Sequence, residues 1–302
     1  MPFVPPAAGP LLSRDIADYP EGIVLAVDKP YRWTSADVIR KLKYAAIRHF
    51  GKKNLKVGHA GTLDPLATGV LLVCIGNACK QAQTLQDHDK EYIARIRFGA
   101  TTPSYDLEKE VDRRFPFAHI TADAVRAALP AFLGEQEQVA PLFSAKSVDG
   151  VRAYELARKL YKAQSKSSAP GEASLFDAAA LETLQRNRIV ISELELLDFV
   201  PAHHPLEGTA LSGASAVGSA ADVALASGTA SSRIHVADTS ALGLPEAVIR
   251  IACSKGTYIR AFARDLGESL GSGAHLGGLI RSRSGQFRVQ DALSLDQALA
   301  LL

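Results

Sequence analysis

Apolar residues recur along this chain with different spacings, and each spacing predicts an element. Over residues 34–51 they follow helical spacing, which predicts a helix capped by Thr34 or Ser35. Over residues 90–99 they occupy every second position, which predicts a half-buried strand. A continuous, β-branched apolar run at residues 70–75 predicts a strand that is buried on both faces.

The same signals place the remaining elements. We expect further helices at residues 121–133, 152–160, 258–270 and 294–302, and further strands at residues 188–199 and 247–253. Strands and helices are mixed without regular βαβ alternation, so an α+β fold is favoured over a doubly wound one.

Two stretches of low complexity interrupt this pattern. Residues 162–173 are short, polar and Ser-rich, and 23 of the 44 residues at 202–245 are Ala, Ser or Gly. We expect both to be insertions, and the second to be a mobile surface excursion. The organisation expected is an N-terminal extension over residues 1–20 and one catalytic domain over residues 21–302, with no separate C-terminal RNA-binding domain.

Composition limits the class of protein. The chain has 302 residues, of which 47% are hydrophobic, enough to bury a core. The longest stretch without a charged residue, 65–79, is too short to span a bilayer, and the Pro-rich residues 1–10 show no basic patch followed by an apolar run, so we expect no secretory signal there. The three cysteines form neither an even disulfide framework nor a CxxC pair. We therefore expect a cytoplasmic protein with free thiols, no membrane contact and no structural zinc site.

Positive charge is concentrated in two distant regions. Residues 29–56 carry nine Lys or Arg against one acid, and residues 250–288 carry seven against two acids, although the whole chain has a net charge of only +2. Two basic regions in an acidic remainder are what a polyanion-binding cleft would need. They are equally compatible with two solvated faces, and charge alone does not decide between these interpretations.

The densest candidate for chemistry is the Gly-rich segment at residues 58–69. It places Asp64 before Pro65 in a loop that precedes the buried strand. A carboxylate fixed on a rigid loop suits nucleophilic or base catalysis. An Asp-Pro pair is, however, also common in turns that have only a structural role. The segment matches neither a Walker loop nor a dinucleotide-binding fingerprint.

Two further side chains allow both a structural and a functional interpretation. Arg260 lies in the first turn of the helix expected at 258–270, where a cation opposes the helix dipole and would be stabilised by a carboxylate partner. A plain surface arginine is the alternative. Tyr92 lies on the apolar face of its strand, where it is either a core residue or a catalytic one.

The segment at 58–69 resembles the catalytic motif of the TruB-type tRNA pseudouridine synthases. Other motifs of that family follow in the same order, which makes coincidence implausible. They are Lys29-Pro30 with Thr34-Ser35, Lys90-Glu91-Tyr92, Phe143 to Lys146 with Gly150 to Arg158, Cys253 to Arg260, Ala263 to Gly267, and Gly273 to Leu276 with Leu279 and Arg281. The chain departs from the family where Arg32 replaces a usual Gly and Ala140 a usual Pro.

The resemblance implies a fold and a set of site residues. The fold would be that of the pseudouridine synthases, a mixed, mainly antiparallel sheet flanked by helices with a central RNA-binding cleft. Asp64 would be the catalytic aspartate, Tyr92 would stack on the target uracil, and Arg260 would pair with the aspartate. The substrate-binding residues implied are His59, Lys29, Lys90, Tyr258 and Leu279.

The resemblance also implies the reaction. Uridine-55 in the T-loop of tRNA would be flipped out of its stack and isomerised to pseudouridine, with no metal and no cofactor. We expect a monomer that acts on the T-loop and elbow of tRNA without an obligatory protein partner or guide RNA. The alternatives are a non-catalytic tRNA-binding or folding module, which would not need Asp64, and a glycosidase-like hydrolase. The hydrolase would need a second carboxylate, and none shares the loop of Asp64.

Overall fold

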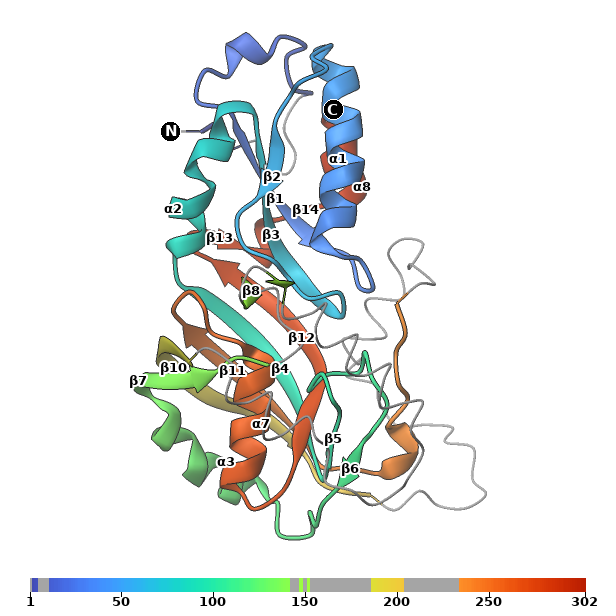
Figure 1. The fold of residues 1–302 in the computed structure, drawn as a ribbon, viewed down its shortest axis with the longest axis vertical. Coiled ribbons are helices and arrows are strands. Elements are labelled where there is room, and N and C mark those ends of the chain that lie inside the picture. Colours follow the sequence, from blue (N-terminus) through green and yellow to red (C-terminus); the bar gives the residue numbers. More distant parts are fainter. Residues whose placement is uncertain (1, 5–10, 142–146, 149–150, 153–185, 204–233) are drawn as a thin grey trace.

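A ten-stranded mixed sheet forms the spine of the molecule (Figure 1). The computed structural model describes residues 2–4, 11–141, 147–148, 151–152, 186–203 and 234–302. The main path of the sheet is β14-β1-β3-β12-β4-β11-β10-β7, with β2 added to β3 and β13 added to β12. Its strands are β1 (Ile23–Lys29), β2 (Val57–His59), β3 (Ala67–Ile75), β4 (Lys90–Phe98), β7 (Gly134–Val139), β10 (Arg186–Val200), β11 (Glu246–Cys253), β12 (Ala274–Ser284), β13 (Phe287–Arg288) and β14 (Leu293–Ser294).

Most neighbouring strands of this sheet are antiparallel. The exceptions are the parallel pairs β1–β14 and β3–β12. Two small hairpins stand apart, β5 (Ala100–Thr101) with β6 (Arg113–Arg114) and β8 (Ser147–Val148) with β9 (Val151–Arg152). Together with the helices these strands confirm the expected α+β fold.

Helices cover the sheet in two groups. The α-helices are α1 (Ser35–Phe50), α2 (Ala82–Asp87), α3 (Ala122–Ala128), α7 (Ile259–Ser269) and α8 (Leu295–Ala300). Helices α1 and α8 bury their apolar residues with β1 and β3 in one core cluster, and α3 and α7 bury theirs with β4, β11 and β12 in another. The molecule therefore has two halves, one containing α1 and α8 and the other containing α3 and α7, which are joined through the centre of the sheet (Figure 1). No helix in the described part of the chain is long and apolar enough to cross a bilayer.

Several elements confirm the sequence prediction because their signals are local. Thr34 caps α1 in a reciprocal capping box with Asp37, and Gly51 ends the helix in the left-handed conformation. Strand β4 buries every second residue as its alternation predicts. Strand β3 is apolar from Val70 to Ile75 because its two faces contribute to two different core clusters.

Two expected helices differ in the structure. The helix expected at 121–133 stops at Ala128 and continues as a 3-10 turn over Leu129–Phe132, because Pro130 has no N–H to extend the α-helix. The helix expected at 152–160 cannot begin at Arg152, which pairs with Ser147 in a hairpin. The rest of that segment lies outside the described residues.

The two low-complexity stretches fall largely outside the described residues. The insertion at 162–173 does so entirely. Of the stretch at 202–245, residues 202–203 and 234–245 are described, and Ala237, Thr239 and Leu244 are buried. The N-terminal extension likewise contributes Leu12 to the core cluster beneath α1.

A buried histidine makes the fold sensitive to acid. His275 on β12 is fully buried, with Nδ1 2.8 Å from the carbonyl oxygen of Ala100, and burial lowers its pKa to about 4. In the unfolded chain the imidazole takes up a proton near pH 6.5, whereas in the folded chain it does so only near pH 4. Lowering the pH through this window therefore favours the unfolded state.

We predict that the free energy of unfolding, measured by urea denaturation, falls by up to about 3 kcal/mol between pH 6.5 and pH 4 because of His275. His275→Asn keeps a donor for the Ala100 carbonyl and should remove this component of the slope. The same change at exposed His119 serves as the control. An unchanged slope in His275→Asn would show that other groups cause the acid sensitivity.

Candidate active site

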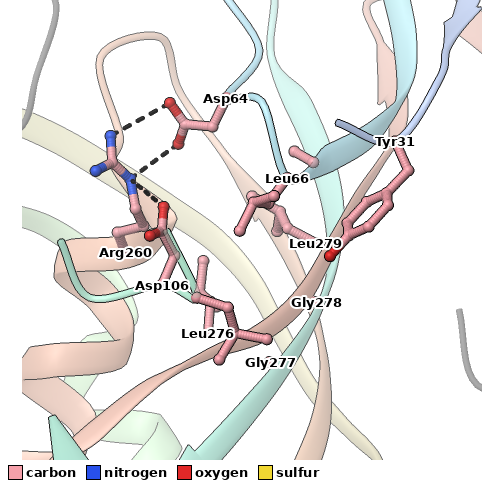
Figure 2. Close-up of a pocket in the computed structure, with 11 residues that line it drawn as sticks. Tyr31, Asp64, Leu66, Asp106, Arg260, Leu276, Gly277, Gly278 and Leu279 are labelled. Atoms are coloured by element: carbon pink, nitrogen blue, oxygen red, sulfur yellow. Dashed lines mark hydrogen bonds and ion pairs between the residues drawn. The ribbon is translucent and has the colours of Figure 1, made fainter. Parts of the chain in front are cut away.

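A pocket lies at the start of β3, beside residues Leu276 to Leu279 of β12 (Figure 2). The two strands pair only from Leu279 with Ala67 to Arg281 with Gly69, and the preceding residues of β12, Leu276 to Gly278, line the pocket instead of pairing with β3. The empty space in and above the pocket is about 320 Å3, part of which is open to solvent. Its lining residues are Tyr31, Asp64, Leu66, Ala67, Asp106, Leu107, Arg260, Leu276, Gly277, Gly278 and Leu279.

The loop that carries Asp64 is held mainly through its backbone. The Ser35 hydroxyl at the start of α1 donates to the Leu63 carbonyl at 3.1 Å and accepts from the Leu63 N–H at 2.9 Å. The buried guanidinium of Arg281 donates to the carbonyls of Gly61 and Thr62, each at 3.3 Å. These contacts fix the loop against α1 on one side and β12 on the other.

Asp64 and Arg260 form a bidentate ion pair. Arg260 Nε lies 2.9 Å from Asp64 Oδ2, and a terminal nitrogen of the same guanidinium lies 3.2 Å from Oδ1. The Arg260 side chain is 7% exposed, whereas Asp64 is 34% exposed and faces the pocket (Figure 2). The helix α7 thus presents a cation from its first turn to the carboxylate, as the helix-dipole argument anticipated.

A second carboxylate approaches the same guanidinium. Asp106 Oδ2 lies 3.8 Å from Arg260 Nε, and Asp106 is held by the Ser104 hydroxyl at 2.6 Å and the Glu108 N–H at 2.9 Å. Burial raises the pKa of Asp106, and burial together with Asp106 raises that of Glu108 to about 7. Burial alone would lower the pKa of Arg260, but Asp64, Asp106 and Glu108 together hold it above its usual range.

Three of the expected site residues line the pocket: Asp64, Arg260 and Leu279. Tyr92 does not line it, but it lies close by on β4, where it pairs across the sheet with Arg281 of β12. The ring is 9% exposed, and burial raises its pKa while Arg281 opposes the shift. Tyr92 therefore belongs to the core beside the pocket in this structure.

The other expected substrate contacts lie around the pocket and do not line it. Lys29 is fully buried and donates to the carbonyls of Pro30, Trp33 and Pro65, and burial lowers its pKa to about 7. Lys90 donates to carbonyls at the end of α2, and burial lowers its pKa to about 8. Tyr258 occupies the position before the first residue of α7, and His59 ends β2 with its Nδ1 buried.

The sequence prediction missed two polar residues of the pocket. Asp106 lies in an irregular segment without periodicity or motif, so no local signal marked it. Tyr31 lies between Lys29-Pro30 and Thr34-Ser35, and this neighbourhood was the only sign in the sequence that it could belong to the site. Within the described part of the chain, no group of three His, Cys, Asp or Glu could hold a metal ion.

Comparison with known proteins decides the family. A family model described as TruB family pseudouridylate synthase (N terminal domain) matches residues 48–170. A Phocaeicola vulgatus protein named tRNA pseudouridine synthase B is 44% identical over 92% of this chain and 92% of its own length. Proteins of the same name from Bacteroides thetaiotaomicron and Deinococcus radiodurans are 43% and 34% identical, over 91% and 90% of this chain and 91% and 77% of their own lengths.

The chain belongs to the TruB family of pseudouridine synthases. It is therefore an enzyme, an isomerase that makes pseudouridine in RNA. Two solved structures agree with the fold expected for the family, an archaeal Nop10–Cbf5 complex and a Cbf5–Nop10–Gar1 complex. Each has a TM-score of 0.50, at 20% and 21% identity, over 93% and 94% of this chain and about half of the matched chain, 53% and 54%.

We predict that Asp106→Asn lowers kcat of this TruB family member by at least tenfold with little change in KM. The amide still accepts from Ser104, but it no longer balances the buried guanidinium of Arg260, which should shift its pairing with Asp64. Steady-state kinetics and circular dichroism check the rate and the fold. Asp112→Asn, at an exposed aspartate that accepts from Thr101, is the control, and equal rates for both variants would contradict the prediction.

Proposed function

We propose that this enzyme converts uridine-55 in the T-loop of tRNA to pseudouridine and that Asp64 carries the reaction. The relatives from Phocaeicola vulgatus, Bacteroides thetaiotaomicron and Deinococcus radiodurans are named tRNA pseudouridine synthase B, which supports tRNA as the substrate. The observation that carries the role of Asp64 is its bidentate pairing with Arg260 at a pocket that four leucines help to line. A carboxylate held in this way has a fixed direction and a cation directly beside it.

The pocket suits a flipped base. In the reaction the bond between N1 of uracil and C1′ of the ribose breaks, the base turns, and C5 bonds to the same C1′. Four leucines line the pocket, Leu66, Leu107, Leu276 and Leu279, and we propose that the base enters among them with its sugar beside Asp64. The proposed stacking of uracil on Tyr92 requires the base to enter beyond Leu279, because the ring is now covered.

The remaining substrate contacts are proposed around this centre. His59 and Tyr258 flank the loop and the helix start, and Lys29 and Lys90 hold the surrounding backbone through carbonyl oxygens. The isomerisation breaks and re-forms one bond within a single nucleotide, so neither a redox cofactor nor an energy source is needed. We further propose that one catalytic domain over residues 21–302 works as a cytoplasmic monomer.

The RNA is proposed to extend from the pocket across the basic surface of α1. Arg40, Lys41, Lys43 and Arg48 are exposed on this helix, and Lys52, Lys53 and Lys56 are exposed directly after it. Because Ser35 anchors the start of α1 to the loop of Asp64, this surface begins beside the pocket. Exposed cations in this position can contact phosphates that flank the T-loop.

The first experiment removes the charge of Asp64. Asp64→Asn preserves size and most packing, and we predict a folded protein that binds tRNA but forms no detectable pseudouridine. Mapping of pseudouridine in tRNA, filter binding and circular dichroism measure the three properties. Asp123→Asn, at a fully solvated aspartate on α3, should behave as the parent.

Turnover by Asp64→Asn at near the parent rate would remove Asp64 from the chemistry and with it the proposed mechanism. Pseudouridine at another tRNA position would contradict only the assignment to uridine-55. Release of free uracil would point instead to a hydrolase.

The second experiment tests the basic surface. Replacing Lys52, Lys53 and Lys56 with Gln should weaken tRNA binding and reduce the slope of log K against log salt by up to about 3, since each phosphate contact contributes about 0.9. Gln replacements of Arg126, Arg186 and Arg188, which are exposed on the other half of the molecule, serve as the control. A slope that does not change in the lysine variant would exclude these residues from the RNA contact.

A further inference from the structure

The loop that carries Asp106 contains a residue with a strained backbone. Among the described residues other than glycine, only Arg32 and Tyr105 have a positive φ, and Tyr105, at +56°, directly precedes Asp106. The left-handed region disfavours every residue that carries a Cβ, and such a conformation persists only where surrounding contacts hold it. The contacts of Tyr105 must therefore offset this cost.

Hydrogen bonds hold the backbone of Tyr105 on both sides. Its N–H donates to the carbonyl of Thr102 at 3.0 Å, which closes a turn, and its carbonyl oxygen accepts from the N–H of Leu276 on β12 at 3.0 Å. The Thr102 hydroxyl also donates to the carbonyl of Asp106 at 2.6 Å. Between these fixed points, the φ of Tyr105 sets the direction in which the chain continues into Asp106.

The side chain of Tyr105 contacts a buried arginine of α7. The guanidinium carbon of Arg264 lies 5.5 Å from the centre of the Tyr105 ring, within the range of a cation–π interaction. Arg264 is 9% exposed, and such an interaction is stronger where water is excluded. Arg264 Nε lies 2.7 Å from Asp265 Oδ1, and a terminal nitrogen donates to the carbonyl of Val139 at 3.0 Å. The ring thus packs against a cation whose position is itself fixed.

Two arginines of α7 contact consecutive residues of the Asp106 loop. Arg260 donates to the carbonyl of Ser104 at 3.2 Å, and its Nε lies 3.8 Å from Asp106 Oδ2 (Figure 2). Arg264 lies one turn further along the same helix and contacts Tyr105, the residue between those two. The orientation of Asp106 toward Arg260 therefore depends on how Tyr105 is held against Arg264.

We propose that Tyr105 is a positioning residue for pseudouridine formation, whose ring, packed against Arg264, holds the strained backbone that orients the Asp106 carboxylate toward Arg260. Without the ring, the backbone would relax toward a negative φ and turn Asp106 away from Arg260. The guanidinium would then lose part of the negative charge around it, and its pairing with Asp64 would shift. This role goes beyond the proposed function, because it does not depend on which uridine is modified.

The first test compares three substitutions of Tyr105. Tyr105→Phe keeps the ring, Tyr105→Ala removes the ring but keeps the strain, and Tyr105→Gly removes both. In single turnovers with saturating enzyme, we expect Tyr105→Phe to react within about twofold of the parent rate and Tyr105→Ala to be at least about fivefold slower. Tyr105→Gly should recover part of this loss, because glycine adopts the left-handed conformation without strain.

Two results of this comparison would overturn the proposal. A rate of Tyr105→Phe as low as that of Tyr105→Ala would assign the effect to the hydroxyl instead of the ring. A rate of Tyr105→Gly no higher than that of Tyr105→Ala would show that the ring does not act by opposing backbone strain.

A double-mutant cycle with Asp106→Asn separates positioning from stability. If Tyr105 acts through the Asp106 carboxylate, Tyr105→Ala should slow the parent enzyme but have little further effect on the rate of Asp106→Asn. The melting temperature should fall in both backgrounds, because the packed ring is lost in both. Equal slowing in the two backgrounds would show a purely structural role and would contradict the proposal.

Tyr19→Ala is the matched control. Tyr19 lies in the N-terminal segment, where its ring packs against those of Phe3 and Phe50. We expect its loss to lower the melting temperature and to leave the single-turnover rate at that of the parent. A loss of rate as large as that of Tyr105→Ala would show that general destabilisation slows the enzyme, and the proposal would fail.

Arg264→Gln tests the same contact from the other side, which keeps the proposal testable even where Tyr105→Ala does not fold. The amide removes the cation beneath the ring and leaves Asp265, which is 31% exposed, in contact with solvent. Circular dichroism verifies the fold of each variant. We expect Arg264→Gln to be at least about threefold slower than the parent in single turnovers, and a parent-like rate in the folded variant would overturn the role of the pair.

Discussion

The buried guanidinium of Arg260 sets the main constraint on this structure. A cation this far from water is stable only if carboxylates surround it, and removing one partner of such a group typically costs several kcal/mol. Asp64 and Asp106 come from separate loops, and Arg260 comes from a helix almost two hundred residues further along. The three segments must therefore pack together for any one of them to be stable, which couples the integrity of the site to that of the fold.

The centre of the sheet makes this convergence possible. Strands β3 and β12 are parallel and pair over only three positions before they separate. Gly69 permits this pairing, because its φ is +100° and a Cβ there would lie 2.2 Å from the carbonyl oxygen of Arg281. The same short pairing that joins the two halves of the sheet also brings Ala67 and Leu279 together in the wall of the pocket.

The sequence predicted best those features whose causes are local. Helix α1 and strand β4 follow from spacing and capping within a few residues, and the resemblance of motifs identified Asp64 and Arg260 before their contact was visible. The sequence did not predict strand β12, because it contains two glycines, a buried histidine and two arginines, which do not form a strand pattern. These residues are accommodated by contacts with neighbouring strands, which the local sequence does not show. Asp106 was missed because its importance comes from a partner about 150 residues away and from burial, neither of which leaves a local pattern.

The hydrogen bonds from Arg281 to the backbone of the Asp64 loop determine which substitutions that loop can accept. Its guanidinium donates to the main-chain oxygens of Gly61, Thr62 and Val70 and to no side chain of those residues. Every amino acid carries this main-chain oxygen, so a substitution at Thr62 keeps its hydrogen bond from Arg281. Loss of Arg281, in contrast, removes the hydrogen bonds at all three positions at once. The path of the loop is therefore encoded far from the loop itself, and the loop is free to vary its outward chemistry without moving Asp64.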